Sequence, residues 1–366
     1  MALPFALNPA LDQLPVYQPG RPIEEVAREL GLPPESIIKL ASNENPLGPS
    51  PLALRALRKT LRAINLYPDG NAFYLKQKLA AKLGVAPANL ILGNGSNEVL
   101  ELVGHALLGP DSEVVVSQYC FAVYPIVTHL FGARLVVVPA KNYAHDLDAM
   151  LQAVTPKTRV VFVANPNNPT GTWVGREQLA RFVHAVPPEV VLVLDEAYIE
   201  FMTEPLDLLP VIRAGAKPNL LLVRTFSKIY GLAGLRLGYG IGHPEFIAAL
   251  EKIRQPFNVN SLAQAAAIAA LDDVRHVERT RRINAQGLKF YEHWFKKLGL
   301  EYLPSAANFI LVKVGDGQRV FGELQKLGVI VRPMASYQLP EWIRITVGTP
   351  SQNRRCLLAL RKVLQI

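Results

Sequence analysis

The chain has 366 residues, which exceeds the length at which a single hydrophobic core usually stops growing and therefore indicates two lobes. Half of the residues are apolar and only 19% are charged, a composition that excludes a disordered chain. The 39 Lys and Arg residues outnumber the 30 Asp and Glu residues, and the resulting net charge of +9 is compatible with nucleic acid, an anionic membrane surface or small anionic ligands.

The chain begins with a segment that is rich in proline. Its apolar periodicity predicts one helix, over residues 23–30. We interpret residues 1–48 as an arm that packs onto another part of the protein.

Residues 49–258 show the pattern of an α/β lobe. Short runs of β-branched residues alternate with amphipathic segments, which is typical of βαβ units with a mainly parallel sheet. Leu179, Phe182 and Val183 recur at helical spacing and predict a helix over 175–186. We predict strands over 113–116, 135–138, 159–163, 190–194, 220–223 and 235–241.

After Asn258 the composition changes, and residues 259–366 predict a smaller α+β lobe. An Ala-rich helix over 261–271 and a long charged helix over 273–298 come first. Strands are predicted over 309–314, 329–331 and 342–347, and a helix over 351–364 ends the chain.

Metal-bound and membrane-spanning proteins are disfavoured. Cys120 and Cys356 have no second cysteine nearby, and the 7 histidines lack HxxxH or HExxH spacing, so we predict no metal site. The start lacks the features of a signal peptide, and no stretch approaches the ~18 uncharged apolar residues of a spanning helix. We expect a cytoplasmic protein.

Polar residues gather where predicted strands end and helices begin, the edge of an open α/β sheet where ligands bind. Gly95, Ser96 and Asn97 would let a phosphate approach the N-terminus of a helix over 99–108, with an ordinary N-cap as the alternative. The loop over 165–171 combines rigid prolines with asparagines whose amides can donate to a ring oxygen, with a plain turn as the alternative.

Three charged residues interrupt or follow apolar strands. A carboxylate at Asp195 needs a cation or a strong donor unless it caps the next helix. Lys228 lies among hydroxyl residues that, with Arg236, suit a phosphate, and its amine can bond covalently to an aldehyde. Arg344 indicates pairing with a carboxylate or phosphate, or else a structural ion pair.

Together these segments resemble the fold-type I aminotransferases, which use pyridoxal 5′-phosphate, and most closely the histidinol-phosphate aminotransferase family. The resemblance covers nearly the whole chain. Residues 17–22, 40–48 and 65–69 are similar to that family's arm, its pocket-lining loop and a tyrosine segment donated across a dimer. The resemblance implies a large domain with a mainly parallel seven-stranded sheet sandwiched by helices, a smaller α+β domain, and a homodimer in which the arm packs on the small domain and the partner subunit.

The resemblance also implies roles for individual residues. Lys228 would bind the cofactor and move a proton, Asp195 would pair with the pyridinium nitrogen, and Tyr198 would bind the phenolic oxygen together with Asn168. Tyr119 would stack on the ring. The cofactor phosphate would be bound by Ser96, Asn97, Thr225, Ser227, Arg236 and, across the dimer, Tyr67. The substrates would be bound by Tyr17, Asn43, Tyr67, Asn168, Arg332 and Arg344.

The implied reaction is transamination of L-histidinol phosphate with 2-oxoglutarate, which gives imidazole-acetol phosphate and glutamate. An aromatic amino acid aminotransferase or a threonine-phosphate decarboxylase would carry the same motifs. A DNA-binding regulator with an aminotransferase-like domain would explain the positive charge, but it would need a helix-turn-helix module of about 60 to 80 residues before the arm. We therefore expect small-molecule substrates, without nucleic acid or membrane partners.

Overall fold

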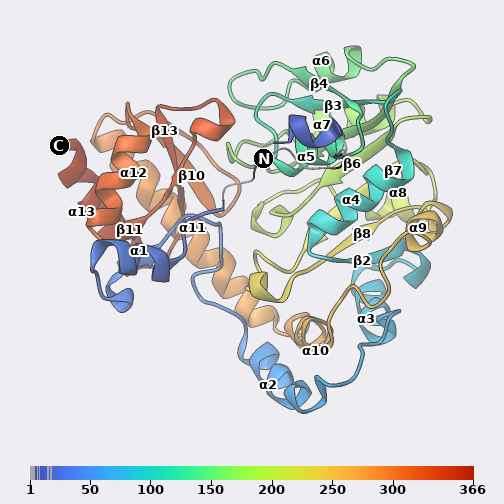
Figure 1. Cartoon of the computed structure of the whole chain (residues 1–366), viewed down its shortest axis with the longest axis horizontal. Helices are drawn as coiled ribbons and strands as arrows, with labels where there is room; N and C mark the ends of the chain where they lie inside the picture. Colours follow the sequence, from blue (N-terminus) through green and yellow to red (C-terminus); the bar gives the residue numbers. More distant parts are fainter. Residues whose placement is uncertain (1–4, 6, 8, 15, 17–18) are drawn as a thin grey trace.

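The computed structural model describes residues 5, 7, 9–14, 16 and 19–366, and it folds into two lobes that lie side by side (Figure 1). Two 3-10 helices, η1 (Pro9–Gln13) and η2 (Pro34–Ser36), lie in the predicted arm. The larger lobe contains the central sheet, and the smaller lobe contains the C-terminus.

The large lobe is built on a seven-stranded sheet, as the resemblance implied, in the order β2-β8-β7-β6-β5-β3-β4. Strand β8 runs antiparallel to both neighbours, whereas the pairs from β7 to β4 are parallel. The strands are β2 (Leu90–Asn94), β3 (Glu113–Ser117), β4 (Arg134–Val138), β5 (Thr158–Ala164), β6 (Val191–Asp195), β7 (Leu220–Thr225) and β8 (Leu237–Ile241).

Helices cover both faces of this sheet because its strands are apolar on both sides. Leu192 and Leu194 of β6 belong to one hydrophobic cluster, and Val193 belongs to another, as the alternation of side chains along a strand requires. One face is covered by α2 (Pro51–Thr60), α3 (Phe73–Leu83), α6 (Leu147–Gln152), α7 (Arg176–Ala185), α8 (Leu209–Arg213) and α10 (Ser261–Ala270). The other face is covered by α4 (Ser96–Leu107), α5 (Val123–Leu130) and α9 (Pro244–Glu251).

Helix α10 lies on the large lobe, although the predicted boundary at residue 258 assigned it to the small one. It packs against α2 and α3, and its residues Ala263 and Ala267 belong to the large-lobe cluster. An Ala-rich helix offers a flat apolar surface to either lobe, so its composition alone does not decide the lobe. We therefore propose a boundary after α10.

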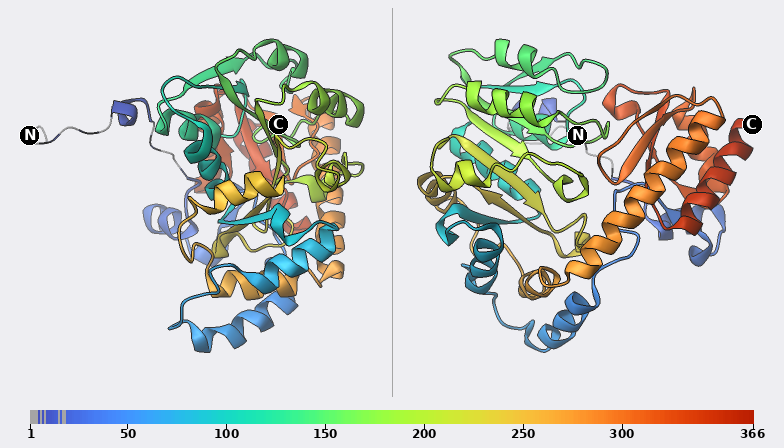
Figure 2. Two further views of the ribbon diagram at one scale, coloured as in Figure 1. Left: turned by 90° about the vertical axis from the view of Figure 1, so that its right-hand side faces the viewer. Right: turned by 180° about the vertical axis from the view of Figure 1, so that it is seen from behind.

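The small lobe packs three helices on short sheets. Its antiparallel sheet has the order β12 (Arg332–Pro333), β13 (Trp342–Thr346), β10 (Phe309–Lys313) and β9 (Tyr302–Leu303). Its helices are α11 (Val274–Lys297), α12 (Gly317–Lys326) and α13 (Pro350–Leu364). Helix α11 runs from beside α10 up to the C-terminal lobe (Figure 2) and contacts both lobes, because Val277 packs on the large-lobe cluster while Tyr291 and Phe295 lie in the small-lobe cluster.

Residues 23–39 of the arm pack on the small lobe, whereas η1 contacts α5 of the large lobe. The arm's helix α1 (Ile23–Leu30) buries Val26 in a cluster with Ile330. Its short strand β1 (Ile38–Lys39) pairs in parallel with β11 (Val329–Ile330). The arm then continues between the lobes, so its next residues lie beside the edge where β5, β6 and β7 end. Its contact with a partner subunit stays a prediction.

Candidate active site

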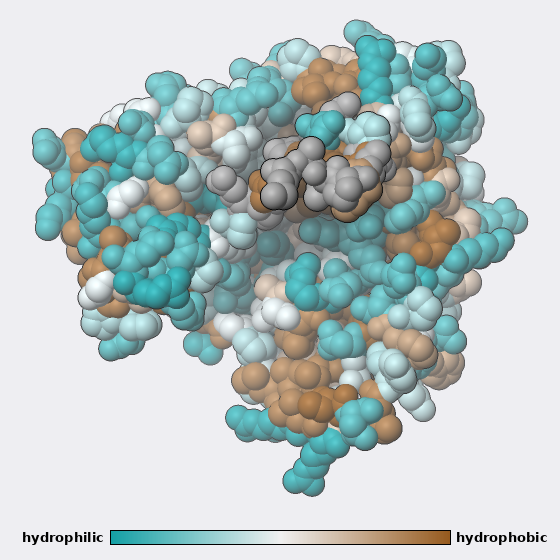
Figure 3. Space-filling model, in the orientation of Figure 1, coloured by the Kyte–Doolittle hydropathy of each residue, from teal (hydrophilic) through white to brown (hydrophobic). Residues whose placement is uncertain are grey.

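A cavity of about 260 Å³ lies between the lobes at the C-terminal edge of the parallel strands, and Figure 3 shows the molecule hollowed there. The structure brings most of the predicted site residues into its wall. They are Asn43, Ser96, Asn97, Asn168, Asp195, Tyr198, Thr225, Ser227, Lys228, Arg236, Arg332 and Arg344.

The register of three neighbouring strands explains why residues distant in sequence meet here. Ala164 at the end of β5 is paired with Asp195 at the end of β6, and Asp195 is paired with Val223 near the end of β7. The segments that follow these strands therefore leave the sheet at the same edge. Asn168, Asp195 and the segment with Lys228 face one cavity for this reason.

Asp195 is buried and held by two hydrogen bonds. Tyr124 Oη donates to Asp195 Oδ2 at 2.8 Å, and the backbone N–H of Ala197 donates to Oδ1 at 3.0 Å. Burial raises the pKa of the Asp195 carboxyl above its usual range, whereas these hydrogen bonds and the charge of Lys228 act to lower it. A protonated ring nitrogen beside this carboxylate would supply the positive charge that stabilises a buried carboxylate.

Lys228 lines the same cavity, and its charge acts on Asp195. Its Nζ is 5.5 Å from the centre of the Tyr198 ring and donates to the carbonyl oxygen of Ser42 at 3.4 Å. Burial raises the pKa of Tyr198 to about 12, although the charge of Arg344 and a hydrogen bond from Asn43 act in the opposite direction. The Tyr198 phenol therefore keeps its proton at neutral pH.

A cradle for a phosphate lies where α4 begins. Gly95 precedes the helix with φ +77° and no side-chain cap, so no N-cap side chain occupies the first N–H groups of α4. A Cβ atom at Gly95 would overlap the Arg236 guanidinium, and one at Gly238 would overlap the backbone of Ser96. Because the glycines let Arg236 and the N–H of Ser96 approach this closely, the residues fit a doubly charged phosphate. Thr225 and Ser227 line the same end.

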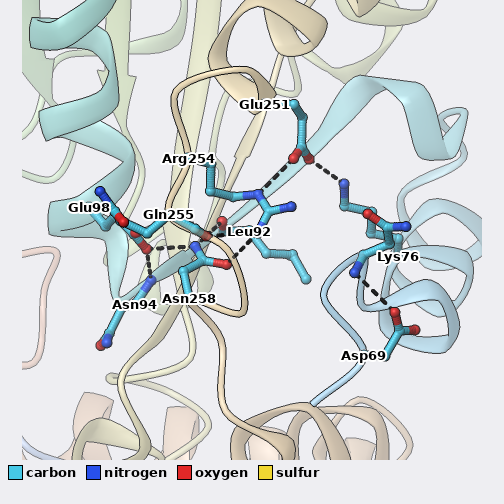
Figure 4. A network of polar contacts seen from close by, with 10 residues as sticks. Asp69, Lys76, Leu92, Asn94, Glu98, Glu251, Arg254, Gln255 and Asn258 are labelled. Carbon is cyan, nitrogen blue, oxygen red and sulfur yellow. Dashed lines mark hydrogen bonds and ion pairs between the residues drawn. The ribbon is translucent and has the colours of Figure 1, made fainter. Parts of the chain in front are cut away.

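A polar network fixes the backbone behind this cradle (Figure 4). The Glu98 carboxylate on α4 accepts from Asn258 Nδ2 at 2.7 Å. Arg254 donates to Asn258 Oδ1 at 2.8 Å and to Glu251 at 2.7 Å, and Lys76 on α3 pairs with Glu251 at 2.5 Å. These contacts tie α3, α9 and α4 together and hold the N-terminus of α4 in place.

The small lobe and the arm supply the opposite wall. Arg344 on β13 is buried, donates from Nη1 to Asn168 Oδ1 at 2.5 Å and from Nη2 to the carbonyl of Ala41 at 3.0 Å. Arg332 on β12 is paired in register with Arg344, so both guanidinium groups reach one side of the cavity. Glu44 and Tyr337 line this wall as well, and sequence reasoning did not single them out.

Two predicted residues that the structure describes, Tyr119 and Tyr67, do not line the cavity. Tyr119 stacks on Tyr143 with ring centres 5.7 Å apart, and Phe121 is the aromatic residue of this segment in the wall, so we propose that Phe121 stacks on the ring in place of the predicted Tyr119. Tyr67 is 84% exposed and stacks on Phe257 at 4.8 Å, which leaves its role across a dimer a prediction. Tyr17 lies outside the described residues.

Sequence reasoning also missed Tyr124. Phe121 and Tyr124 follow β3 with a spacing of one helical turn, and α5 begins at Val123. This turn places Phe121 in the wall and directs the Tyr124 hydroxyl to Asp195. In the sequence, the signal for Tyr124 is an aromatic pair, three positions apart, that follows a predicted strand.

Among the residues that the structure describes, no cluster of three or more His, Cys, Asp or Glu side chains could hold a metal ion. None of the helices in those same residues combines the length and the apolar character needed to cross a membrane.

Comparisons with known proteins agree with this geometry. A family model for aminotransferase class I and II matches residues 35–360. The histidinol-phosphate aminotransferase of Akkermansia muciniphila is 52% identical over 365 residues, which cover 100% of both chains. Histidinol-phosphate aminotransferase 2 of Pseudomonas fluorescens is 54% identical over 98% of this chain and 97% of that relative.

A solved structure is similar along nearly its whole length. The crystal structure of histidinol-phosphate aminotransferase from Sinorhizobium meliloti in complex with pyridoxal-5′-phosphate superposes with a TM-score of 0.88 at 31% identity, and the match covers 98% of this chain and 97% of that one. From the family match and the full-length relatives, this chain belongs to the class I and II aminotransferases, and within them to the histidinol-phosphate aminotransferase family.

Proposed function

We propose that this enzyme binds pyridoxal 5′-phosphate and transfers the amino group of L-histidinol phosphate to 2-oxoglutarate, which yields imidazole-acetol phosphate and glutamate in histidine biosynthesis. Relatives at 52% and 54% identity over the full chain carry the name of this activity, and the similar solved structure contains the cofactor. The observation that carries the proposal is one cavity shared by Lys228, the buried Asp195 and the cradle at Gly95.

Each end of the cofactor has residues that suit it. The N–H groups at the start of α4, Ser227 and Arg236 would hold the phosphate. Asp195 would pair with the ring nitrogen, and Tyr198 with Asn168 would bind the phenolic oxygen. When bound, the cofactor supplies an aldehyde and an electron-accepting ring.

The chain's own residues then orient the amino substrate and move its proton. Arg344 would bind the carboxylate of glutamate, and Arg332 would bind the anionic group at the other end of either substrate. Lys228 lines the same cavity as these guanidinium groups and Asp195, and its amine would take a proton from the α-carbon of the amino substrate.

The proposal extends to a homodimer in the cytoplasm. Leu54, Leu61, Ile64 and Leu66 are each at least 40% exposed, and an apolar area is visible over α2 at the lower edge of Figure 3. Such a patch favours an interface, which would also bring Tyr67 toward the cavity of the second subunit. Analytical ultracentrifugation would contradict the dimer if only a 40.3 kDa species sedimented, and cell fractionation would test the location.

An assay with defined amines tests the reaction. The enzyme loaded with the cofactor should convert 2-oxoglutarate to glutamate when L-histidinol phosphate is present, faster than with aromatic amino acids. Lys228→Ala should lower the rate by about 10²- to 10⁴-fold, because the general base is lost, and should change the visible absorption of the bound cofactor. Release of carbon dioxide from threonine phosphate without glutamate, or full activity in Lys228→Ala, would contradict the proposal.

A further inference from the structure

Asn43 lies where the arm, the small lobe and the large lobe meet. It is 1% exposed and has a left-handed backbone with φ +56°, which asparagine tolerates better than most residues. Its carbonyl oxygen accepts from Asn308 Nδ2 at 2.9 Å, and its side chain reaches Tyr198. Asn43 was predicted to bind substrate, but its amide is engaged with the protein on both sides.

The hydroxyl of Thr346 determines how the Asn43 amide is turned. Thr346 is 3% exposed, and its Oγ1 accepts from the backbone N–H of Asn43 at 2.9 Å. The same hydroxyl donates its one proton to Asn43 Oδ1 at 3.2 Å. With the amide oxygen facing Thr346, the amide nitrogen faces Tyr198.

The amide nitrogen determines in turn where the Tyr198 proton points. Asn43 Nδ2 donates to Tyr198 Oη at 2.9 Å, and an amide N–H can only donate. The phenol oxygen therefore accepts from Asn43, and its own proton has to be directed to another acceptor. Tyr198 is packed edge-on against Phe309 with ring centres 5.4 Å apart, and the cavity offers the remaining open side.

We propose that Asn43 is a positioning residue, held by Thr346, that turns the hydroxyl proton of Tyr198 into the cavity and toward an anionic oxygen of the bound cofactor. This inference rests on the proposed function. The opposite amide orientation would present donors to Thr346 and draw the Tyr198 proton onto Asn43 Oδ1. The two orientations thus differ in whether Tyr198 donates to the ligand or to the protein.

The pH titration of the visible absorption of the bound cofactor distinguishes these cases. A donor to the phenolic oxygen stabilises the negative charge that is left when the bound cofactor loses its proton. Loss of that donor therefore raises the pH at the midpoint of the titration. Asn43→Asp places an acceptor beside Tyr198 and should draw its proton away. We expect this variant to raise the midpoint, in the same direction as Tyr198→Phe.

The added negative charge of Asn43→Asp by itself also raises the midpoint. The effect of Asn43→Asp is therefore measured a second time in the Tyr198→Phe background, where residue 198 has no hydroxyl proton to redirect. We expect the shift to be larger by about 0.5 to 1 pH unit when Tyr198 is present, which is roughly a three- to tenfold change in the proton equilibrium. Equal shifts in the two backgrounds would overturn the proposal. Thr346→Val should raise the midpoint by a smaller amount, whereas Thr346→Ser, which keeps the hydroxyl, should restore it.

The outcomes also separate this inference from the proposed function. A parent protein that shows no visible absorption after incubation with pyridoxal 5′-phosphate would overturn both. Normal absorption and transaminase activity, together with equal shifts in the two backgrounds, would overturn the role of Asn43 alone.

Discussion

The two walls of the cavity are built in different ways. On the large-lobe wall, Asp195 ends β6, and Thr225 and Lys228 lie at or just after the end of β7, so a parallel sheet brings them together. On the opposite wall, Asn43 and Arg344 are separated by 301 positions and meet through hydrogen bonds between the arm and β13. The first wall depends on local strand ends, and the second depends on long-range contacts.

The two walls also differ in the roles that we propose for them. In the proposed function, the large-lobe wall would present buried groups to the cofactor, whereas the second wall would present the guanidinium groups of Arg332 and Arg344 to the substrates. Changes at the two arginines of the second wall should therefore affect substrate constants with little effect on cofactor binding, and changes in the first wall should do the reverse.

Arg344→Lys tests the second wall and has the largest expected effect. A lysine cannot reproduce the planar fork that contacts Asn168 and faces the cavity, so kcat/KM for glutamate should fall about 100-fold, or about 3 kcal/mol, while the cofactor absorption stays unchanged. Steady-state kinetics measure this, with the exposed Arg354→Lys on α13 as the matched control. A lost cofactor spectrum with an unchanged KM would reverse the assignment of the walls.

Gly95→Ala tests the first wall. The added Cβ meets the Arg236 guanidinium and the φ of +77° is strained for alanine, so affinity for pyridoxal 5′-phosphate should fall about 10- to 30-fold. Gly175→Ala is the control, because Gly175 also precedes a helix but has φ −67° and open space around its Cβ position. Titration of the apoprotein by absorbance gives both affinities, and equal values would show that the cradle does not hold the phosphate.

A substitution at Glu200 tests the contact between the large lobe and α11, and it has the smallest expected effect. Glu200 lies in η5 (Ile199–Phe201), and its carbonyl oxygen accepts from Arg281 of α11 at 2.7 Å. Burial raises the pKa of Glu200 from 4.5 to about 7, against the opposing charges of Arg224 and Arg281. The folded protein therefore holds a proton that the unfolded chain releases, so the free energy of unfolding should decrease as pH rises from about 4.5 to about 7.

Glu200→Gln should remove this decrease, which is on the order of 1 kcal/mol because Glu200 as a whole is only half-buried. Urea unfolding at several pH values measures it. Glu204→Gln, which removes an exposed carboxylate nearby, should leave the slope as it is in the parent protein. The same slope in Glu200→Gln and the parent would contradict the assignment.

The contrast between the walls also explains how much could be predicted from the sequence. Strand ends carry a local signal, since an apolar run followed by Asp195 or Lys228 is visible in a short window. The Asn43–Thr346 pair has no such signal, because each residue alone resembles an ordinary loop or strand position. Tyr119 and Phe121 lie two positions apart, and only the path of the chain after β3 decides which ring faces the cavity.

Helix α11 has a mechanical consequence. It has 24 residues and is therefore about 36 Å long. Its first turns are fastened to the large lobe and the arm, through Arg281 and through the 3.2 Å hydrogen bond between Asn45 and Thr280, and its last turns are embedded in the small lobe. A rotation of about 5° around residues 280–281 would carry the far end of the helix, about 25 Å away, through about 2 Å. A tilt of the small lobe about these fastened turns would therefore move Arg344, which belongs to that lobe, relative to Asp195 of the large lobe.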